Sequence, residues 1–287
     1  MISVKYRLGI FFLIALSMVA CEEEPPTINF GVADEEVSYD NEIQAAQEKN
    51  VLIEEFSGVQ CVNCPAGAAK IEEIVATLGE RVIPVTLHAG QFAVPIPNVS
   101  QYDFNIPEAE ELNTFFGVQG YPSSVIDRYQ FSGQFSIVNY NPNTWQSFVG
   151  ERLAESTPIN IDIHNTVSNN TLQCQVEINY TQAVSDNNKL SVYIIEDNII
   201  DAQDLVGNVI DTTYVHKHVV RAMLTVANGV TLIGNNVEKP AGTKILRNFT
   251  YENIPAEWDL AHCEVVALVQ AGEVSSIYQV AREHFLP

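Results

Sequence analysis

The chain has 287 residues and a mass of 31.8 kDa, and 46% of its residues are hydrophobic, so it can bury real cores and is not a disordered chain. Acidic residues outnumber basic residues by 36 to 14, which gives a formal net charge of −22 at pH 7. A nucleic-acid-binding protein needs a basic surface, so we expect no nucleic-acid partner. Five cysteines are too few for a small disulfide-rich protein.

The first twenty residues predict a signal peptide. Lys5 and Arg7 give a basic start, and the apolar run over residues 8–20 is shorter than the ~20 residues that a membrane-spanning helix needs. Cys21 follows directly, so residues 1–20 resemble the signal peptide of a bacterial lipoprotein, in which this cysteine is lipidated. An ordinary secretory signal with an incidental cysteine is the alternative. The resemblance implies a protein that is held on the membrane by a lipid at Cys21.

Residues 21–45 predict an acidic tether between that cysteine and the folded body, because they contain Pro25, Pro26 and several acidic residues. The acidic run Glu22–Glu24 resembles the surface-export signal of some Gram-negative lipoproteins. We therefore expect a protein that is lipid-anchored in the outer membrane and faces either the periplasm or the cell surface.

Residues 46–155 predict an α/β domain. A short run of branched apolar residues is typical of a buried strand, and the helical spacing that follows it ends at Gly79, a natural helix stop. Prolines within residues 89–107 indicate a loop or an insertion. Strands and helices alternate along the segment, as in helices that pack on a sheet. The expected strands are residues 51–56 and 81–89 and one that follows a turn within 117–129, and the expected helices are residues 68–79, 108–116 and 143–155.

Residues 156–287 predict an all-β domain of the immunoglobulin-like sandwich type. Apolar and polar residues alternate here with a period of two, which is typical of half-buried strands. About seven such segments, separated by turn residues, form the pattern of a β-sandwich. The expected strands are residues 159–164, 171–180, 189–197, 218–226, 243–252, 263–271 and 275–281.

The motif Cys61-Val62-Asn63-Cys64 lies between a predicted strand and the start of a predicted helix. A thiolate at a helix N-terminus is stabilised by free backbone N–H groups and by the helix dipole, so its pKa falls and it can attack a disulfide at neutral pH. Cys61 could then act as the nucleophile, and Cys64 could resolve the mixed disulfide. His88, at the end of the next predicted strand, could approach this site or be an ordinary strand-end residue.

This arrangement resembles the thioredoxin fold in two further features. Glu55 lies six residues before Cys61, where thioredoxins carry a buried acid that relays protons to the resolving thiol, Cys64. Pro122 matches the cis proline of thioredoxins, and Tyr121 would then present its backbone to an extended substrate. The resemblance implies that these five residues form a redox-active centre with a protein thiol or disulfide as substrate. It implies no dissociable cofactor.

Two other interpretations of the cysteines stay open. The Cys61–Cys64 pair could be a structural disulfide or half of a zinc site, although a zinc site needs a second pair of ligands that the sequence lacks, so we expect no metal. Cys174 and Cys263 each lie in a predicted strand of the second domain. In an oxidising envelope they could form a structural disulfide, and buried free thiols are an equal alternative.

Histidine and aspartate residues near position 210 give weaker signals. His216 and His218 have the spacing of a strand face and could bind a metal, but no third ligand is evident, and a solvated face or a domain contact is the simpler interpretation. Asp201, Asp204 and Asp211 lie in a loop-like stretch without the spacing of a calcium loop, and we expect them to be surface charges.

Three longer segments extend the resemblance to most of the mature chain. They are EEFSGVQCVNCPAG, FGVQGYPSSVIDR and YVHKHVVRA, and they are similar to segments of the outer-membrane-protein-twenty-eight family of Gram-negative lipoproteins. The resemblance implies a thioredoxin-like domain, a C-terminal β domain and an address in the outer membrane.

Two functions are consistent with these patterns. The first is a lipid-anchored thiol–disulfide oxidoreductase that uses the CxxC site. The second is a non-catalytic binding or scaffold lipoprotein in which the CxxC is a structural disulfide. The exposure of Cys61 discriminates between them, because a redox site needs an accessible sulfur beside Pro122, whereas a structural disulfide would be buried.

Overall fold

The computed structural model describes residues 35–272 and 276–286. The predicted signal peptide, Cys21 and the first part of the predicted tether lie outside the described residues. The described part of the tether is not a free linker, which corrects the prediction there. Strand β1 (Glu35–Tyr39) pairs antiparallel with β13 (Thr243–Glu252) over its whole length. Among the described residues, no helix is long and apolar enough to cross a membrane.

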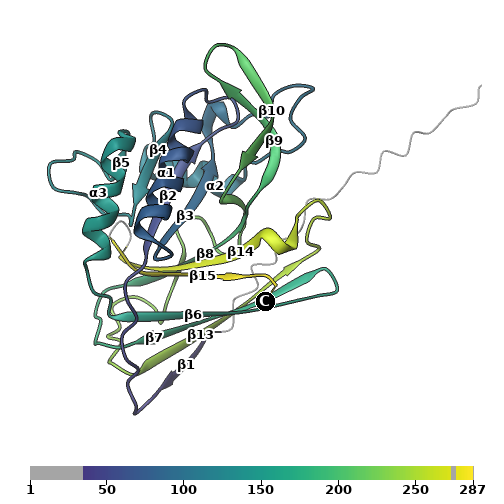
Figure 1. The fold of residues 1–287 in the computed structure, drawn as a ribbon. Coiled ribbons are helices and arrows are strands. Elements are labelled where there is room, and N and C mark those ends of the chain that lie inside the picture. The colour runs from purple at the N-terminus through teal and green to yellow at the C-terminus, as the bar shows by residue number, and fades with distance from the viewer. Residues whose placement is uncertain (1–34, 273–275, 287) are drawn as a thin grey trace, which may run out of the picture.

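A nine-stranded sheet forms the centre of the molecule (Figure 1). Its order is β15-β14-β8-β11-β3-β2-β4-β5, and β12 pairs with β8 outside this path. Strand β11 lies parallel to β3 and antiparallel to β8, so strands from both sides of residue 156 form one continuous sheet. The strands are β2 (Val51–Ser57), β3 (Val82–His88), β4 (Ser123–Ile126), β5 (Val138–Asn139), β8 (Asn188–Glu196), β11 (Val219–Met223), β12 (Val230–Thr231), β14 (Cys263–Ala271) and β15 (Ile277–His284).

A four-stranded sheet of order β1-β13-β7-β6 packs against one end of the large sheet. Burial alternates along β13 and along much of β6 (Ile159–Ser168) and β7 (Thr171–Tyr180), as the period of two predicts for strands with one covered face. Their inner side chains share a core with those of β8 and β14. The prediction of a β-rich chain is confirmed, and it includes two sheets packed around a common core.

Three helices cover the two faces of the large sheet near β2. Helices α1 (Cys64–Leu78) and α3 (Pro142–Leu153) share a core with Val51 and Ile53, whereas α2 (Pro107–Phe116) shares one with Leu52 and Phe56 on the opposite face. Successive side chains of a strand point to opposite faces. A strand that is covered on both faces therefore has apolar residues at neighbouring positions and not only at every second one. The strands and helices predicted within residues 46–155 are therefore present. Two short 3₁₀ helices, η1 (Gly90–Phe92) and η2 (Leu260–His262), complete the helical elements of the described chain.

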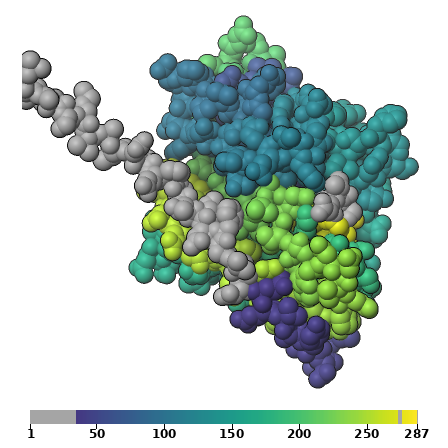
Figure 2. Space-filling model, turned by 180° about the vertical axis from the view of Figure 1, so that it is seen from behind, coloured from purple at the N-terminus to yellow at the C-terminus, as the bar shows by residue number. Residues whose placement is uncertain are grey.

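A separate hairpin projects from the molecule beside α1 and α2 (Figures 1 and 2). It consists of β9 (Ile199–Leu205) and β10 (Val209–His216), joined through Gly207 and Asn208, which both have positive φ. We predicted a loop here, and that prediction is wrong. The aspartates of this segment interrupt the alternation of apolar and polar residues, so the sequence pattern did not indicate the two strands. Asp201 is also not a surface charge, because its buried carboxylate accepts hydrogen bonds from backbone N–H groups of the segment before α2.

Candidate functional site: a covered CxxC disulfide

Cys61 and Cys64 form a disulfide between the end of β2 and the first turn of α1, with their Cα atoms 5.3 Å apart. A tight turn places them, since the Cys61 N–H donates to the Gly58 carbonyl and the Cys64 N–H donates to the Cys61 carbonyl. Pro65 then starts the helix at a position where no backbone N–H is required. The location at a helix N-terminus agrees with the sequence prediction.

The disulfide is covered by the β9–β10 hairpin. The exposed fractions of Cys61 and Cys64 are 4% and 2%. The Gln203 side-chain amide, on β9, donates to the Cys61 carbonyl at 3.1 Å, and the Asp204 N–H donates to the Val59 carbonyl at 2.8 Å. The hairpin is thus fixed to the turn that carries the first cysteine. The exposed Cys61 that a redox site requires is not observed, because both cysteines of the disulfide are buried.

Glu55 lies inside the same region with an incompletely satisfied carboxyl group. Its exposed fraction is 1%; Oε2 accepts a hydrogen bond from Thr86 Oγ1 at 3.2 Å, and Oε1 has no hydrogen-bond partner. Burial disfavours the charged form and raises the pKa of Glu55 to about 8. The carboxyl group is therefore mainly protonated at neutral pH and can donate a hydrogen bond.

The Tyr121–Pro122 peptide bond is cis and lies against the first turns of α1. A Cβ atom on Gly67 would be 2.7 Å from Pro122 Cβ and 2.9 Å from Glu55 Oε1, so only glycine allows the helix, the proline and the acid to meet here. The Tyr121 hydroxyl donates to Asn113 Oδ1 at 2.6 Å. The structure therefore brings Glu55 and Pro122 together beside the CxxC helix, while the catalytic roles of these residues stay predictions.

His88 and His216 form a buried aromatic cluster with Phe104 next to this site. The two imidazole rings are 5.6 Å apart, and each is 5.0 Å from the Phe104 ring. His216 Nε2 contacts the Ala202 carbonyl at 3.3 Å, whereas His88 Nδ1 has no partner. Burial lowers the pKa of both histidines, that of His216 to about 4. No local pattern indicated that these two rings meet, because a strand of the hairpin brings His216 to the end of β3.

The proposed pairing of His216 with His218 is wrong. His218 follows the end of β10 with a positive φ, and its ring contacts Glu72 at 3.0 Å and Asp197 at 3.1 Å instead. The backbone leaves the strand conformation between the two histidines, so they do not share a face. The described residues contain no group of three His, Cys, Asp or Glu side chains that could hold a metal ion.

We expect His216 to make the fold sensitive to acid. In the folded protein its pKa is about 4, against about 6.5 in an unfolded chain, so the unfolded state binds more protons between these values. The contribution of His216 to the free energy of unfolding is then fully present above pH 6.5, and it falls by about 3 kcal/mol as the pH drops to 4. His216→Phe should flatten this part of the profile in urea unfolding, and the exposed His164→Phe should not. Parallel profiles for wild type and His216→Phe would contradict the assignment.

Cys174 and Cys263 are free thiols, which corrects the alternative of a structural disulfide between them. Both side chains are buried in the core that the two sheets share, where they pack as small apolar groups. Burial raises the pKa of each thiol to about 12, so neither is a reactive thiolate at neutral pH.

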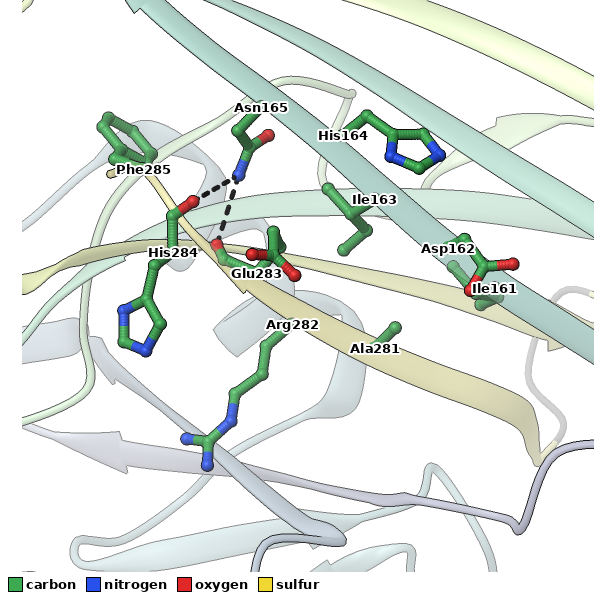
Figure 3. A pocket seen from close by; sticks show the side chains of 10 residues that line it. All are labelled: Ile161, Asp162, Ile163, His164, Asn165, Ala281, Arg282, Glu283, His284 and Phe285. Carbon is green, nitrogen blue, oxygen red and sulfur yellow. Dashed lines mark hydrogen bonds between the residues drawn. The ribbon is translucent and has the colours of Figure 1, made fainter. Parts of the chain in front are cut away.

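A second concave region lies between the edge strands β6 and β15 (Figure 3). It is an open groove of about 490 Å³ with mostly polar walls. The Asn165 side-chain amide spans it and donates to the backbone carbonyls of Glu283 and His284 at 3.2 and 3.1 Å. Asn165 therefore bonds to carbonyl groups of the edge strand β15 that would otherwise be free to pair with a strand of another chain. No residue of this groove was singled out from the sequence.

The fold and the covered site define a β-rich protein with a buried CxxC disulfide. The chain belongs to the family "Outer membrane protein Omp28", whose family model matches residues 109–285. This membership confirms the resemblance that the sequence motifs indicated and assigns the protein to the outer membrane.

Two solved structures share the overall fold. HBP35 of Porphyromonas gingivalis is 19% identical with a TM-score of 0.62, and the match covers 84% of this chain and 76% of that chain. Protein AGR_C_4864 from Agrobacterium tumefaciens is 9% identical with a TM-score of 0.51, over 84% of this chain and 96% of that chain. A search of curated protein sequences gave no match.

A third solved structure is a domain of the outer membrane lipoprotein Omp28 from Porphyromonas gingivalis. It is 16% identical over 45% of this chain and 88% of that chain, and its TM-score of 0.31 is too low to support a comparison of folds.

Proposed function

We propose that this protein is a non-catalytic binding or scaffold lipoprotein of the outer membrane, and that its Cys61–Cys64 disulfide is structural. The observation that carries the proposal is the burial of both cysteines under the β9–β10 hairpin. Thiol–disulfide exchange needs an incoming thiolate to reach a sulfur atom. The hairpin is bonded through Gln203 to the turn that carries Cys61, and both cysteines are buried, which supports a blocked approach.

We further propose that Cys21 carries a lipid and that residues 46–155 and 156–287 are a thioredoxin-like unit and a β-sandwich unit. Family membership supports the location in the outer membrane. The thioredoxin-like unit is supported by the strand–helix–strand order around the CxxC and by the cis bond before Pro122. The first described strand begins at Glu35. The fourteen residues from Cys21 to that strand could span at most about 50 Å, so the folded body would stay close to the membrane.

A structural disulfide should resist reduction while the protein is folded. In the mature chain with Cys21→Ser, we expect dithiothreitol to reduce Cys61–Cys64 at least about a hundredfold more slowly in buffer than in denaturant, because the sulfurs are covered. Thiol counting should give two free thiols before reduction and four after it. The double variant Cys61→Ala/Cys64→Ala should lose about 2 kcal/mol of stability, as expected for opening a very short loop.

The control for this experiment is the double variant Cys174→Ala/Cys263→Ala, which removes the free thiols and should leave the reduction kinetics of the remaining disulfide unchanged. Fast reduction in buffer, with a potential between about −270 and −120 mV, would contradict the structural role and indicate a redox protein.

A second candidate function is thiol–disulfide exchange with an opened hairpin. The observation that favours it is the meeting of Glu55 and the cis Pro122 at Gly67, next to a CxxC at a helix N-terminus. In this case Gln203→Ala, which removes the side-chain bond to the Cys61 carbonyl, should speed exchange with a test disulfide after reduction. The same substitution combined with Cys61→Ser should abolish exchange. An unchanged rate in Gln203→Ala would leave the structural role as the better account.

A further inference from the structure

We propose that the β9–β10 hairpin is an acid-operated lid, which the protonation of His88 and His216 releases from the body so that the Cys61–Cys64 disulfide is uncovered. The hairpin forms a two-stranded sheet of its own and projects from the body (Figure 1), so it can move without breaking a ladder to either of the larger sheets. The inference rests on the covered disulfide of the proposed function and adds the condition under which the cover opens.

The lid and the disulfide line one small cavity. Cys64 faces this cavity from α1, and Gln203, Tyr214 and His216 face it from the hairpin. Its volume is about 20 Å³, which is room for about one water molecule. A reductant can therefore reach the sulfur of Cys64 from this side only after the hairpin has moved.

The hydrogen bonds that hold the lid come from β9. The Gln203 side-chain amide donates to the Cys61 and Gly58 carbonyls at 3.1 and 3.3 Å, and the Asp204 N–H donates to a backbone carbonyl of the same turn. On β10 the buried residue is His216, and its ring packs against the body. The contact of His216 with the body is thus the part of the closed lid that can change its charge.

Protonation would place like charges inside this contact. The rings of His88 and His216 lie 5.6 Å apart, and both pack against Phe104. Arg221, on β11, adds a positive charge with its Cζ 5.7 Å from the Phe104 ring. The carboxylate of Asp201 faces His216 and favours its charged form, but this carboxylate already accepts hydrogen bonds from three backbone N–H groups. Movement of the hairpin would separate His216 from His88 and relieve the repulsion.

The other titratable groups of the small cavity do not neutralise these charges. Glu55, on β2, stays mainly protonated below its raised pKa of about 8, and burial raises the pKa of Tyr214 to about 12. Lys217 is a further cation and already forms an ion pair with Glu72 of α1. Acid therefore adds positive charge to the closed lid without a matching negative charge.

Burial holds the lid closed at neutral pH. It lowers the pKa of His88 and of His216, so both rings are neutral at pH 7. In the open form the rings would meet water, and each pKa would return toward about 6.5. The open form then binds more protons than the closed form, so the free energy of opening falls as the pH falls.

The test measures reduction of Cys61–Cys64 by tris(2-carboxyethyl)phosphine at pH 7 and pH 4.5, in the mature chain with Cys21→Ser. Each rate is divided by the rate for oxidised glutathione at the same pH. His216, with a pKa of about 4 when closed and about 6.5 when open, should by itself raise this relative rate about fiftyfold at pH 4.5. The double variant His88→Phe/His216→Phe should show a rise of less than about threefold, and each single variant should fall between.

The matched control is His164→Phe, which replaces an exposed histidine of β6 and should keep the wild-type rise. Hydrogen exchange of the wild type at pH 4.5, corrected for intrinsic rates, needs no variant to fold. Residues 199–216 should lose protection while residues 171–180 keep it. An unchanged relative rate, an equal rise in the double variant, or loss of protection in both segments together would overturn the inference. Fast reduction at pH 7 would instead contradict the structural disulfide, so the two proposals can fail separately.

Discussion

Arg128→Met should lower the free energy of unfolding by about 3 to 5 kcal/mol. Arg128 and Glu54 are 2% and 0% exposed and form a two-pronged ion pair, with Nη2 to Oε1 at 2.7 Å and Nε to Oε2 at 3.0 Å. The Tyr193 hydroxyl also donates to Glu54 Oε1, at 2.8 Å. Removal of the guanidinium would leave the buried Glu54 carboxylate with only the tyrosine as partner. A buried charge that has lost its ion-pair partner is strongly destabilising, because its desolvation is no longer compensated.

This cluster also joins parts of the chain that are distant in sequence. Glu54 lies on β2, Arg128 follows β4, and Tyr193 lies on β8, beyond residue 156. Urea unfolding monitored by circular dichroism measures the loss. The double variant Glu54→Leu/Arg128→Met should lose less than Arg128→Met alone, because no charge is then left unpaired. Lys70→Met, which breaks an exposed pair with Glu73, should change stability by less than about 1 kcal/mol.

Glu55 should make the protein less stable in alkaline solution by about 4 to 5 kcal/mol. Its pKa is about 8 in the folded protein, against about 4.5 in an unfolded chain, so the folded state binds more protons between these values. The stabilisation is fully present below pH 4.5 and is lost as the pH rises through 8. Unfolding experiments in urea from pH 5 to pH 9 would measure this slope.

Glu55→Gln should remove the alkaline loss, because the amide keeps the shape of the carboxyl group and does not ionise. Glu80→Gln, at an exposed position after α1, is the matched control and should leave the wild-type slope in place. A Glu55→Gln profile that runs parallel to the wild-type profile between pH 5 and pH 9 would contradict a raised pKa for Glu55.

Local patterns in the sequence predicted the elements that depend on local physics. The short run of branched apolar residues that begins β2, the helical spacing that ends at Gly79 and the alternation along β7 each correspond to an element of the structure. The resemblance to the thioredoxin fold also implied that an acid, Glu55, a CxxC motif and a proline, Pro122, would meet. Glycine at position 67 makes that contact possible, and nothing in a linear pattern identifies it beforehand.

Long-range pairing decided the features that matter most for the function. The aspartates of the β9–β10 hairpin broke the alternation of apolar residues, so the sequence concealed the element that bonds to the turn of the buried disulfide. The same pairing brings His216 to His88 and carries β11 to β3, which makes one sheet from both halves of the chain. The sequence by itself determined the family, the outer-membrane address, the local elements and the position of the CxxC at a helix N-terminus. Only the tertiary structure decided the accessibility of the sulfurs, because exposure depends on which distant segment packs over a residue and not on its neighbours in the chain.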